Sequence, residues 1–352
     1  MTTTVQTADI IKSGTGFSLV TGGDALFLME GTIIASIDGT GIYGTAGNHT
    51  VYVYGSAYGN NTGAVFTNGG NALFVAETGS VTSGANSSGP VAVSMFGGNN
   101  TLTNHGIISG ERTYGVAMYG DNASLINTGN ITAKFGSIMW SSGASSGGRI
   151  WNSGQVLSTN VTGAAINFDH FASTTTDTVI HNSGVIKSLR AEAISGIYAE
   201  LKIVNSGTIA GATYSYQAGD SDDIVINDGV MIGNVSLGDG SNTYTGRLGQ
   251  VIGRIESGAG ADTITGGALA DTIIAGHGAN EVRGLGGDDL IVTGDQADFI
   301  VAGTGDDDIE SGNGDDEIRG GDGEDFINGQ GGVDFIQGGN GNDYIRMGNG
   351  DG

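Results

Sequence analysis

The chain of 352 residues contains 68 glycines, one proline and no cysteine. This glycine content, without the proline and regular spacing of collagen, predicts short strands joined by tight turns. The missing cysteines exclude disulfide scaffolds, thiolate zinc sites and cysteine nucleophiles. The net charge of -25 is concentrated beyond residue 217, where there are 26 acidic and five basic residues. Such a surface argues against binding to nucleic acid or anionic lipid headgroups, and it favours cations as partners.

The N-terminal segment lacks the features of a Sec signal peptide. Its sequence, MTTTVQTADIIKSGTG, has neither a basic n-region nor a continuous apolar h-region. No stretch of the chain reaches the roughly 18 apolar residues of a membrane span. We therefore expect no membrane insertion, and we expect any export signal to lie elsewhere than at this end.

Residues 1–217 carry a loose repeat of about 24 residues, typical of a parallel β-solenoid. Its clearest copies share the pattern aliphatic-x-Asn-x-Gly-x-aliphatic, with Asn104, Asn127, Asn152, Asn182, Asn205 and Asn227. A second motif, such as TGIYG at 40–44, lies between copies, so each coil is expected to have about three short strands. We predict a right-handed parallel β-helix in which the asparagines stack as a hydrogen-bonded ladder. An antiparallel sandwich, the alternative, would lack this period.

An outward-facing apolar stripe is expected along this β-helix. If the aliphatic residue two before each asparagine points inward, the residue directly before the asparagine points outward. That position gives Met29, Tyr54, Ala76, Thr103, Ile126, Trp151, His181, Val204 and Ile226. Such a stripe favours a contact surface, either between rods or against a sugar through Tyr54 and Trp151. The alternatives are that a terminal segment covers the stripe, or that the assumed phase is wrong.

Residues 218–256 are interpreted as transition coils. AGDSDDIVI (218–226) and LGDGSNTYT (237–245) are acidic nonapeptides interleaved with the last Asn-x-Gly coil, and no Pro/Ser linker separates them. One solenoid is therefore expected to continue into another. About nine coils and six further turns, spaced about 4.8 Å apart, predict a rod about 70 Å long.

Residues 257–352 contain a strict nine-residue repeat. Asp or Asn recurs at Asp262, Asp271, Asn280, Asp289, Asp298, Asp307, Asp316, Asp325, Asp334 and Asp343, and a β-branched aliphatic residue follows two positions later. The glycine-rich part of each unit suits a tight turn, and two units make one coil of 18 residues. Carboxylates stacked about 4.8 Å apart repel by about 0.9 kcal/mol in water and roughly 3.5 kcal/mol at a dielectric constant of 20, so they require cations. Calcium fits, because it accepts six to eight oxygen ligands in flexible geometry.

These units resemble the RTX, or haemolysin-type, calcium-binding repeat G-G-x-G-x-D-x-U-x, as in GGDGEDFIN (320–328) and GGNGNDYIR (338–346). The resemblance implies a parallel β-roll that folds around several calcium ions after type I secretion into calcium-rich medium. It implies these ligands: Asp262, Asp271, Asp289, Asp298, Asp307, Asp316, Asp325, Asp334 and Asp343. Departures at Leu269, Asn280 and Gln296 predict less complete calcium binding in the first half of the array. A metal-free solenoid with ordinary turn aspartates is the alternative.

Taken together, these patterns predict an all-β, extracellular, calcium-binding structural protein of a bacterial surface. The candidate roles are an S-layer, filament or biofilm-matrix subunit, or an adhesin, with self-association and a surface polysaccharide as the candidate partners. The N-terminal repeats resemble in architecture those of many bacterial surface-protein passengers. Because the chain ends in mid-repeat at GNGDG, we expect either a fragment or an end that stacks on the next subunit.

Two other functions were weighed against this one. A β-helix polysaccharide lyase or epimerase with an RTX module would need basic residues to hold an anionic sugar and a His or Tyr for proton transfer. Only seven basic residues occur before residue 218, and the best acid/base pair is Asp169 with His170. RTX proteases are excluded because His-Glu-x-x-His is absent. We therefore predict that the protein is not an enzyme; a passive calcium-binding carrier module is the third alternative.

Overall fold

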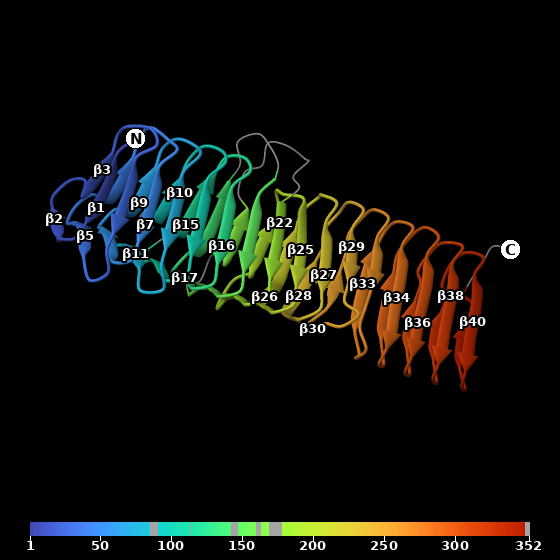
Figure 1. The fold of residues 1–352 in the computed structure, drawn as a ribbon. Helices are drawn as coiled ribbons and strands as arrows, with labels where there is room; N and C mark the ends of the chain where they lie inside the picture. Colours follow the sequence, from blue (N-terminus) through green and yellow to red (C-terminus); the bar gives the residue numbers. More distant parts are fainter. Residues whose placement is uncertain (85–90, 113, 142–146, 160–162, 169–177, 349–352) are drawn as a thin grey trace.

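The computed structural model describes residues 1–84, 91–112, 114–141, 147–159, 163–168 and 178–348. The described residues are all-β, and all their strand pairings are parallel. Figure 1 shows an elongated rod of stacked coils, with the two termini at opposite ends. The predicted all-β fold, a parallel β-helix continuing into a β-roll, is confirmed. No helix long and apolar enough to cross a membrane occurs in the described ranges.

Face A is one side of the rod and runs along its whole length as a single sheet. Its 16 strands are β1 (Thr3–Gln6), β4 (Ala25–Leu28), β7 (Thr50–Val53), β10 (Ala72–Val75), β13 (Thr101–Asn104), β16 (Ser124–Asn127), β19 (Arg149–Asn152), β22 (Thr178–Asn182), β25 (Leu201–Asn205), β27 (Ile224–Asn227), β29 (Thr243–Thr245), β32 (Thr263–Thr265), β34 (Glu281–Gly286), β36 (Phe299–Thr304), β38 (Glu317–Asp322) and β40 (Phe335–Asn340). Each strand pairs with its equivalent one coil away; Leu102, for example, lies opposite Leu125. At about 4.8 Å per strand, the rod is about 70 Å long.

Face B follows face A in each of the first coils. Its strands are β2 (Ile10–Lys12), β5 (Ile33–Ser36), β8 (Ser56–Gly59), β11 (Ser80–Ser83), β14 (Ile107–Gly110), β17 (Asn130–Ala133), β20 (Gln155–Ser158), β23 (Val185–Ser188), the first parts of β26 (Thr208–Ala218) and β28 (Val230–Ser236), and β30 (Gln250–Ile252). Within the described residues this column ends with β30, inside the segment interpreted as transition coils. Coils are three-sided before that point and two-sided after it.

Face C closes each coil. Its strands are β3 (Phe17–Leu19), β6 (Thr40–Gly44), β9 (Thr62–Phe66), β12 (Val91–Met95), β15 (Tyr114–Tyr119), β18 (Gly136–Ser141), β21 (Ile166–Phe168), β24 (Ile194–Gly196), the second parts of β26 and β28, β31 (Ile255–Glu256), β33 (Thr272–Gly276), β35 (Leu290–Thr293), β37 (Asp308–Glu310), β39 (Phe326–Asn328) and β41 (Tyr344–Arg346). Faces A and C are therefore the two sides that continue into the C-terminal roll.

The core is built from inward-pointing apolar residues that stack from coil to coil. On face A the stack includes Leu125, Ile150 and Ile180 in the β-helix, and it continues through Tyr244 into Ile264. The β-branched residues predicted to point inward in the roll are fully buried in eight of ten units: Ile264, Ile273, Val282, Ile291, Ile300, Ile309, Ile318 and Ile327. Burial of each such side chain stabilises the fold by about 1.5–3 kcal/mol. The core is therefore unbroken where the three-sided coils become two-sided.

The predicted asparagine ladder is confirmed. The side-chain Nδ2 of Asn104, Asn127, Asn152, Asn182 and Asn205 each donates to Oδ1 of the next asparagine at 2.7–2.8 Å. Asn227, the last of the six, instead has its Nδ2 3.4 Å from the hydroxyl of Tyr244. Within the ladder each amide both donates and accepts, and Oδ1 of Asn104, at its upstream end, is the ladder's one buried oxygen without a partner among the described residues.

In the coils of β4, β7 and β10, the outward-facing stripe of face A consists of different residues from those that the sequence pattern predicted. Strand register places Phe27, Tyr52 and Phe74 in line with Thr103. The prediction that Met29, Tyr54 and Ala76 belong to the stripe was wrong. Leu28, Val53 and Val75 occupy the positions that asparagine occupies in later coils, so Met29, Tyr54 and Ala76 follow the strands and lie in the turns. From Thr103 to Ile226 the predicted stripe lies on face A as expected.

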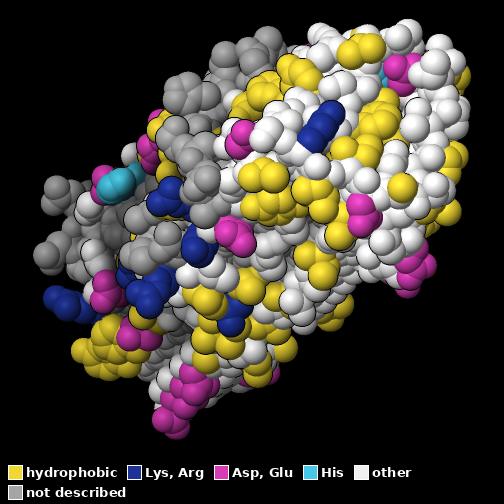
Figure 2. Space-filling model, turned by 90° about the vertical axis from the view of Figure 1, so that its left-hand side faces the viewer, with side chains coloured by type: hydrophobic (Ala, Val, Ile, Leu, Met, Phe, Trp, Pro, Cys, Tyr) yellow, Lys and Arg dark blue, Asp and Glu magenta, His cyan; other side chains and the backbone are white. Residues whose placement is uncertain are grey.

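Figure 2 views the molecule from its N-terminal side, where hydrophobic side chains cover much of the visible surface. Val5, Ile11 and Val20 of the first coil are among the exposed aliphatic residues.

Candidate metal centre

The side chains that recur every nine residues form two ladders, because alternate units fall on opposite sides of the two-sided roll. The face A ladder consists of Asp262, Asn280, Asp298, Asp316 and Asp334, and the face C ladder consists of Asp271, Asp289, Asp307, Asp325 and Asp343. Each of these residues directly precedes its strand. From Asn280 onward, Oδ1 accepts a hydrogen bond of 2.8–3.1 Å from the backbone N–H of the residue 18 positions earlier. This bond fixes each carboxylate between two coils.

The second carboxylate oxygen is left without a donor in most rungs. Oδ2 is buried and has no hydrogen-bond partner among the described residues at Asp289, Asp298, Asp307, Asp316, Asp325 and Asp334. The first rung of each ladder differs, since Ser257 donates to Oδ2 of Asp262 and the backbone of Gly267 donates to Oδ2 of Asp271. A buried, unpaired carboxylate oxygen is costly unless a cation lies against it. The six free oxygens therefore fit a row of bound cations.

Glycine lets the carboxylate lie close against the backbone of the turn in several units. A Cβ atom added to Gly284, Gly320 or Gly329 would overlap Oδ2 of the aspartate five residues later. The aspartates concerned are Asp289, Asp325 and Asp334. The units between Gly284 and Gly320 have Thr293, Ala302 and Ser311 at this position, so glycine is not required in every turn.

Two other positions, two and four residues before the aspartate, have a left-handed backbone in most turns of the roll. Three of the residues that are not glycine at these positions still adopt it, with φ of 82° at Leu285, 78° at Gln296 and 56° at Gln330. Leu269, the fourth such residue, is not among the positive-φ residues. A left-handed conformation costs a residue with a Cβ roughly 1–2 kcal/mol. At these three residues the packing of the repeat therefore imposes a backbone conformation that the residue itself disfavours.

Burial raises the pKa of these carboxyl groups. The pKa of Asp289 rises to about 7 and those of Asp298 and Asp307 rise to about 6, chiefly through burial, although the backbone hydrogen bond lowers each of them. Repulsion from the next carboxylate in the ladder raises the pKa further. A bound cation reverses this balance, because it favours the ionised form.

The ladders do not form a cage made of side chains alone. Among the described residues, no group of three or more His, Asp or Glu side chains converges as a metal cluster would. Each rung offers carboxylate oxygen, and the glycine turns beside it offer backbone carbonyl oxygens. Calcium accepts both kinds of ligand, so the donor set suits calcium better than it suits a transition metal, which prefers nitrogen or sulfur.

The face A ladder extends further upstream than the predicted site residues. The backbone N–H of Leu201 donates to Oδ1 of Asp223 at 2.6 Å, that of Asp223 to Asn242 at 2.8 Å, and that of Asn242 to Asp262 at 2.7 Å. Oδ2 of Asp223 is buried without a partner, and burial raises the pKa of Asp223 to about 7. The signal for Asp223 was present in AGDSDDIVI, where an aspartate precedes a buried valine by two residues.

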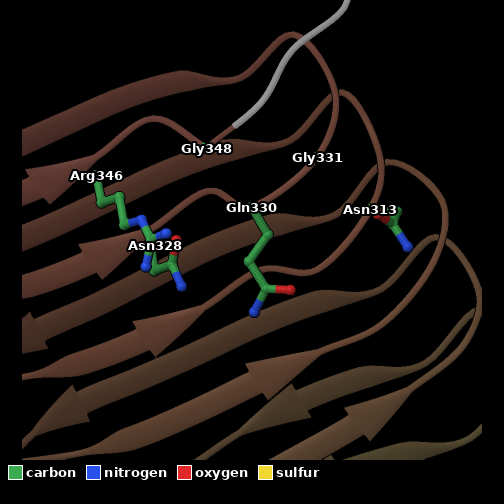
Figure 3. Close-up of a pocket in the computed structure, with 6 residues that line it drawn as sticks. All are labelled: Asn313, Asn328, Gln330, Gly331, Arg346 and Gly348. Carbon is green, nitrogen blue, oxygen red and sulfur yellow. The ribbon is translucent and has the colours of Figure 1, made fainter.

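A hollow of about 420 Å³ lies on the outer side of the last turns. Figure 3 shows Arg346 and Asn328 side by side on neighbouring strands, with Gln330 next to them and Asn313 pointing away on another turn. The amide of Gln330 lies 3.4 Å from the carboxylate of Glu310. This hollow contains none of the ladder aspartates, so it is separate from the candidate cation row.

Comparison with known families identifies the roll. The family model described as RTX calcium-binding nonapeptide repeat (4 copies) matches residues 256–291, 283–318, 292–327, 310–345 and 319–352. The C-terminal region is an array of RTX calcium-binding repeats. No curated protein and no solved structure matches the chain. The family predicted from the sequence is thus confirmed, and RTX repeats bind calcium. The assignment of single aspartates as ligands stays a prediction, as do the predicted domain boundaries.

The RTX array and the solenoid together fit an extracellular calcium-binding structural protein, since RTX repeats are typical of secreted proteins. The acid/base pair weighed for catalysis, Asp169 with His170, lies outside the described residues, as do the last residues of the GNGDG segment.

Proposed function

We propose that the protein is a structural component of a bacterial surface, exported by type I secretion and folded by calcium outside the cell. It acts without catalysis as an S-layer, filament or biofilm-matrix subunit, or as an adhesin. In calcium-poor cytosol the RTX roll stays unfolded, and in calcium-rich medium it completes a rod that associates with other copies or with a surface.

The observation that carries this proposal is the row of six buried aspartate oxygens without a donor. Those carboxylates oppose folding of the roll until cations neutralise them, because burying unpaired negative charge is unfavourable. The unbroken core then joins the roll to the β-helix as one stiff body. Calcium thus acts as the signal that the chain has reached the outside.

Further support comes from the surface of the β-helix. Face A carries a stripe of half-buried aromatic and aliphatic side chains over several coils, including Phe27 stacked on Tyr52 with ring centroids 4.6 Å apart. A stripe of this kind suits lateral contact with another copy or with a surface polymer.

Negative-stain electron microscopy of the purified chain tests the proposal, first in EGTA and then after addition of calcium to millimolar concentration. We expect filaments or sheets that appear only with calcium. The variant D307N/D325N, which removes charge from two rungs of the face C ladder, should require more calcium for the same assembly. Isolated short rods at every calcium concentration would contradict a self-assembling role, and assembly in EGTA would contradict calcium control.

A further inference from the structure

The middle of face A carries a groove whose chemistry differs from the rest of this acidic protein. The groove has a volume of about 340 Å³ and lies along the corner between face A and face B, over strands β16, β19, β22 and β25. Its described lining consists of Ile126, Trp151, Asn152, Ser153, His181, Asn182, Ser183, Val204 and Ser206. None of these residues is acidic, although the chain as a whole has a net charge of -25.

Strand register arranges this surface in columns that run along the rod. One column contains Trp151, His181 and Val204, which lie next to one another in successive coils. The rings of Trp151 and His181 are stacked, with an angle of 7° between their planes and 6.2 Å between their centroids. Aromatic rings provide a flat apolar surface and, at their edges, a hydrogen-bonding group.

A column of hydroxyl groups runs along one side of the rings. Ser153, Ser183 and Ser206 each follow the ladder asparagine of their coil, so the Asn-x-Gly turn presents one hydroxyl per coil. A serine hydroxyl both donates and accepts hydrogen bonds. The asparagine side chains beneath them are committed to their own ladder, as Asn152 donates to Asn182 at 2.8 Å.

Two cations lie on the other side of the rings. Arg149 and Lys202 both pair with Val179 of the coil between them, so they flank it on the outer surface of face A. The guanidinium of Arg149 lies 6.0 Å from the ring centre of Trp151. Both cationic side chains are exposed. Across the three coils, cations, rings and hydroxyl groups therefore lie in three parallel columns, although Val179 separates the two cations and Val204 ends the column of rings.

We propose that this groove binds a linear acidic polysaccharide, such as a uronate polymer, lying along the rod axis. A pyranose ring has an apolar C–H face, a rim of hydroxyl groups and, in a uronate, a carboxylate. These three features match the Trp151 column, the serine column and the Arg149–Lys202 pair. Carboxylates form the stronger, charge-assisted hydrogen bonds with Arg and Lys. These features are spread over the three coils of β19, β22 and β25, so a ligand that reaches all of them must extend along the rod axis.

A second hollow on the same corner gives the contrast within the molecule. It has a volume of about 370 Å³ and is lined by Tyr54, Phe74, Ala76, Glu77, Thr78 and His105. It also contains aromatic rings, but Glu77 places a carboxylate in it, whereas no acidic residue is in the described lining of the groove at Trp151 and Arg149 lies beside that groove. The Arg149–Lys202 pair therefore favours binding of an acidic glycan in the groove at Trp151, whereas the carboxylate of Glu77 disfavours it in the second hollow.

The inference adds a ligand to the structural role and does not depend on assembly, since a dispersed rod would bind the same glycan. The test is isothermal titration calorimetry of the calcium-loaded chain with two probes. These are a hexamer of galacturonic acid and the uncharged cellohexaose. We expect the acidic hexamer to bind more tightly than the neutral one, and its affinity to fall as salt rises.

Variants locate the site. W151A and the double variant R149Q/K202Q should each weaken binding of the acidic hexamer by about tenfold. Matched controls are Y54A, which removes a ring from the second hollow, and R283Q/R319Q, which removes two cations from face A within the RTX roll; both should change the affinity less than twofold. Circular dichroism in calcium verifies that each variant is folded.

Several outcomes would overturn the inference. These are equal binding of both hexamers, unchanged binding by W151A and R149Q/K202Q, or no binding of either probe. Loss of rod assembly in W151A with unchanged hexamer binding would also overturn it, because the groove would then be a contact between copies. Filament formation without glycan binding would leave the structural role standing and reject the groove, so the two proposals fail separately. Mass spectrometry of the hexamer after incubation should show it intact; shortened products would point to a catalytic groove instead of a binding groove.

Discussion

The two halves of the rod use the same device, a ladder of short polar side chains, with opposite consequences. In the β-helix, each asparagine amide donates to the next and accepts from the previous one. In the RTX roll, each aspartate accepts a backbone N–H with one oxygen and leaves the other without a donor. An amide ladder pairs its own members and leaves a free oxygen at its upstream end alone, at Asn104 within the described residues, whereas a carboxylate ladder leaves one in most rungs. We therefore expect the β-helix to fold without calcium and the RTX roll to fold only with it.

Removal of calcium should give the largest effect. It should unfold the RTX roll, which has the aspartate ladders, and leave the β-helix, which has the asparagine ladder, folded. With EGTA at pH 7.5, we expect residues 263–346 to lose protection from amide hydrogen exchange while the asparagine-ladder coils from Thr101 to Asn205 retain it. Addition of calcium should restore protection. Magnesium at the same concentration serves as the control, because it prefers rigid octahedral sites and keeps its water. Equal protection of both regions in EGTA would remove the distinction between the two ladders.

Changing a ladder asparagine of the β-helix into aspartate should lower the stability of the β-helix, because it leaves a buried carboxylate oxygen without a donor, as in the roll. In N152D, the side chain can no longer donate to Asn182, so two acceptors face each other in a buried position. We expect the free energy of unfolding to fall by about 2–4 kcal/mol, measured by urea denaturation in EGTA. N130D, at an exposed position of β17, is the matched control and should change stability by less than about 0.5 kcal/mol. A mild effect of N152D would mean that the ladder contributes little.

Acid should partly replace calcium in the roll. The pKa of Asp289 is raised to about 7 and those of Asp298 and Asp307 to about 6, whereas an unfolded aspartate titrates near 3.9. Between these values the folded roll binds more protons than the unfolded one, so its stability is present at low pH and is lost as pH rises through the folded-state pKa. In EGTA we expect more β-structure at pH 5 than at pH 7.5.

The same linkage applies in calcium, where protons and calcium compete for the ladder. The calcium concentration at the folding midpoint should therefore rise as pH rises from 5 to 7.5, because protons then no longer stabilise the folded roll in place of calcium. Circular dichroism at both pH values measures both effects. A calcium-free roll that gains structure with rising pH would show the opposite sign and contradict the burial of these carboxylates.

The smallest expected effect concerns backbone strain. Leu285 has φ of 82° at a turn position that is usually glycine. L285G should stabilise the calcium-loaded roll by about 0.5–1 kcal/mol, since relief of strain exceeds the entropy cost of glycine. L269G is the control, because Leu269 occupies a similar place in its unit without a positive φ and is exposed. Thermal denaturation in calcium compares them, and equal shifts would argue against strain at Leu285.

Much of this architecture could be predicted from periodicity. A spacing near 24 residues predicted the coils of the β-helix, and a spacing of nine residues predicted those of the roll. Both predictions rest on the fact that every coil of a solenoid repeats the same inward-facing positions. The asparagine ladder followed from the recurrence of one polar residue at a fixed position. The predicted stripe residues were wrong in the coils of β4, β7 and β10, since Leu28, Val53 and Val75 stand there in place of asparagine and only strand pairing reveals their equivalence.

The details of the metal centre were less accessible. The spacing identified the aspartates, but not that Oδ1 is committed to a backbone N–H while Oδ2 is left free, because that depends on the stacking distance between coils. The extension of the ladder to Asp223 was also missed as a site residue, although its segment was recognised as acidic and repeat-like. Gln296 looked like a departure because most units have glycine at its position, yet the backbone keeps the left-handed geometry there, as it does at Gln330.

The unbroken core between β29, β31 and the first RTX coil also has a kinetic consequence. In a solenoid each coil contacts only its neighbours, so its stability is a sum of coil terms and nearest-neighbour terms. The finished β-helix presents β29 and β31 as a template, and the roll gains its first coil without forming a new nucleus. Calcium-driven folding should then proceed as a front that advances from residue 263 towards residue 346. Its rate should reflect propagation along one dimension, as in the growth of a crystal from a seed.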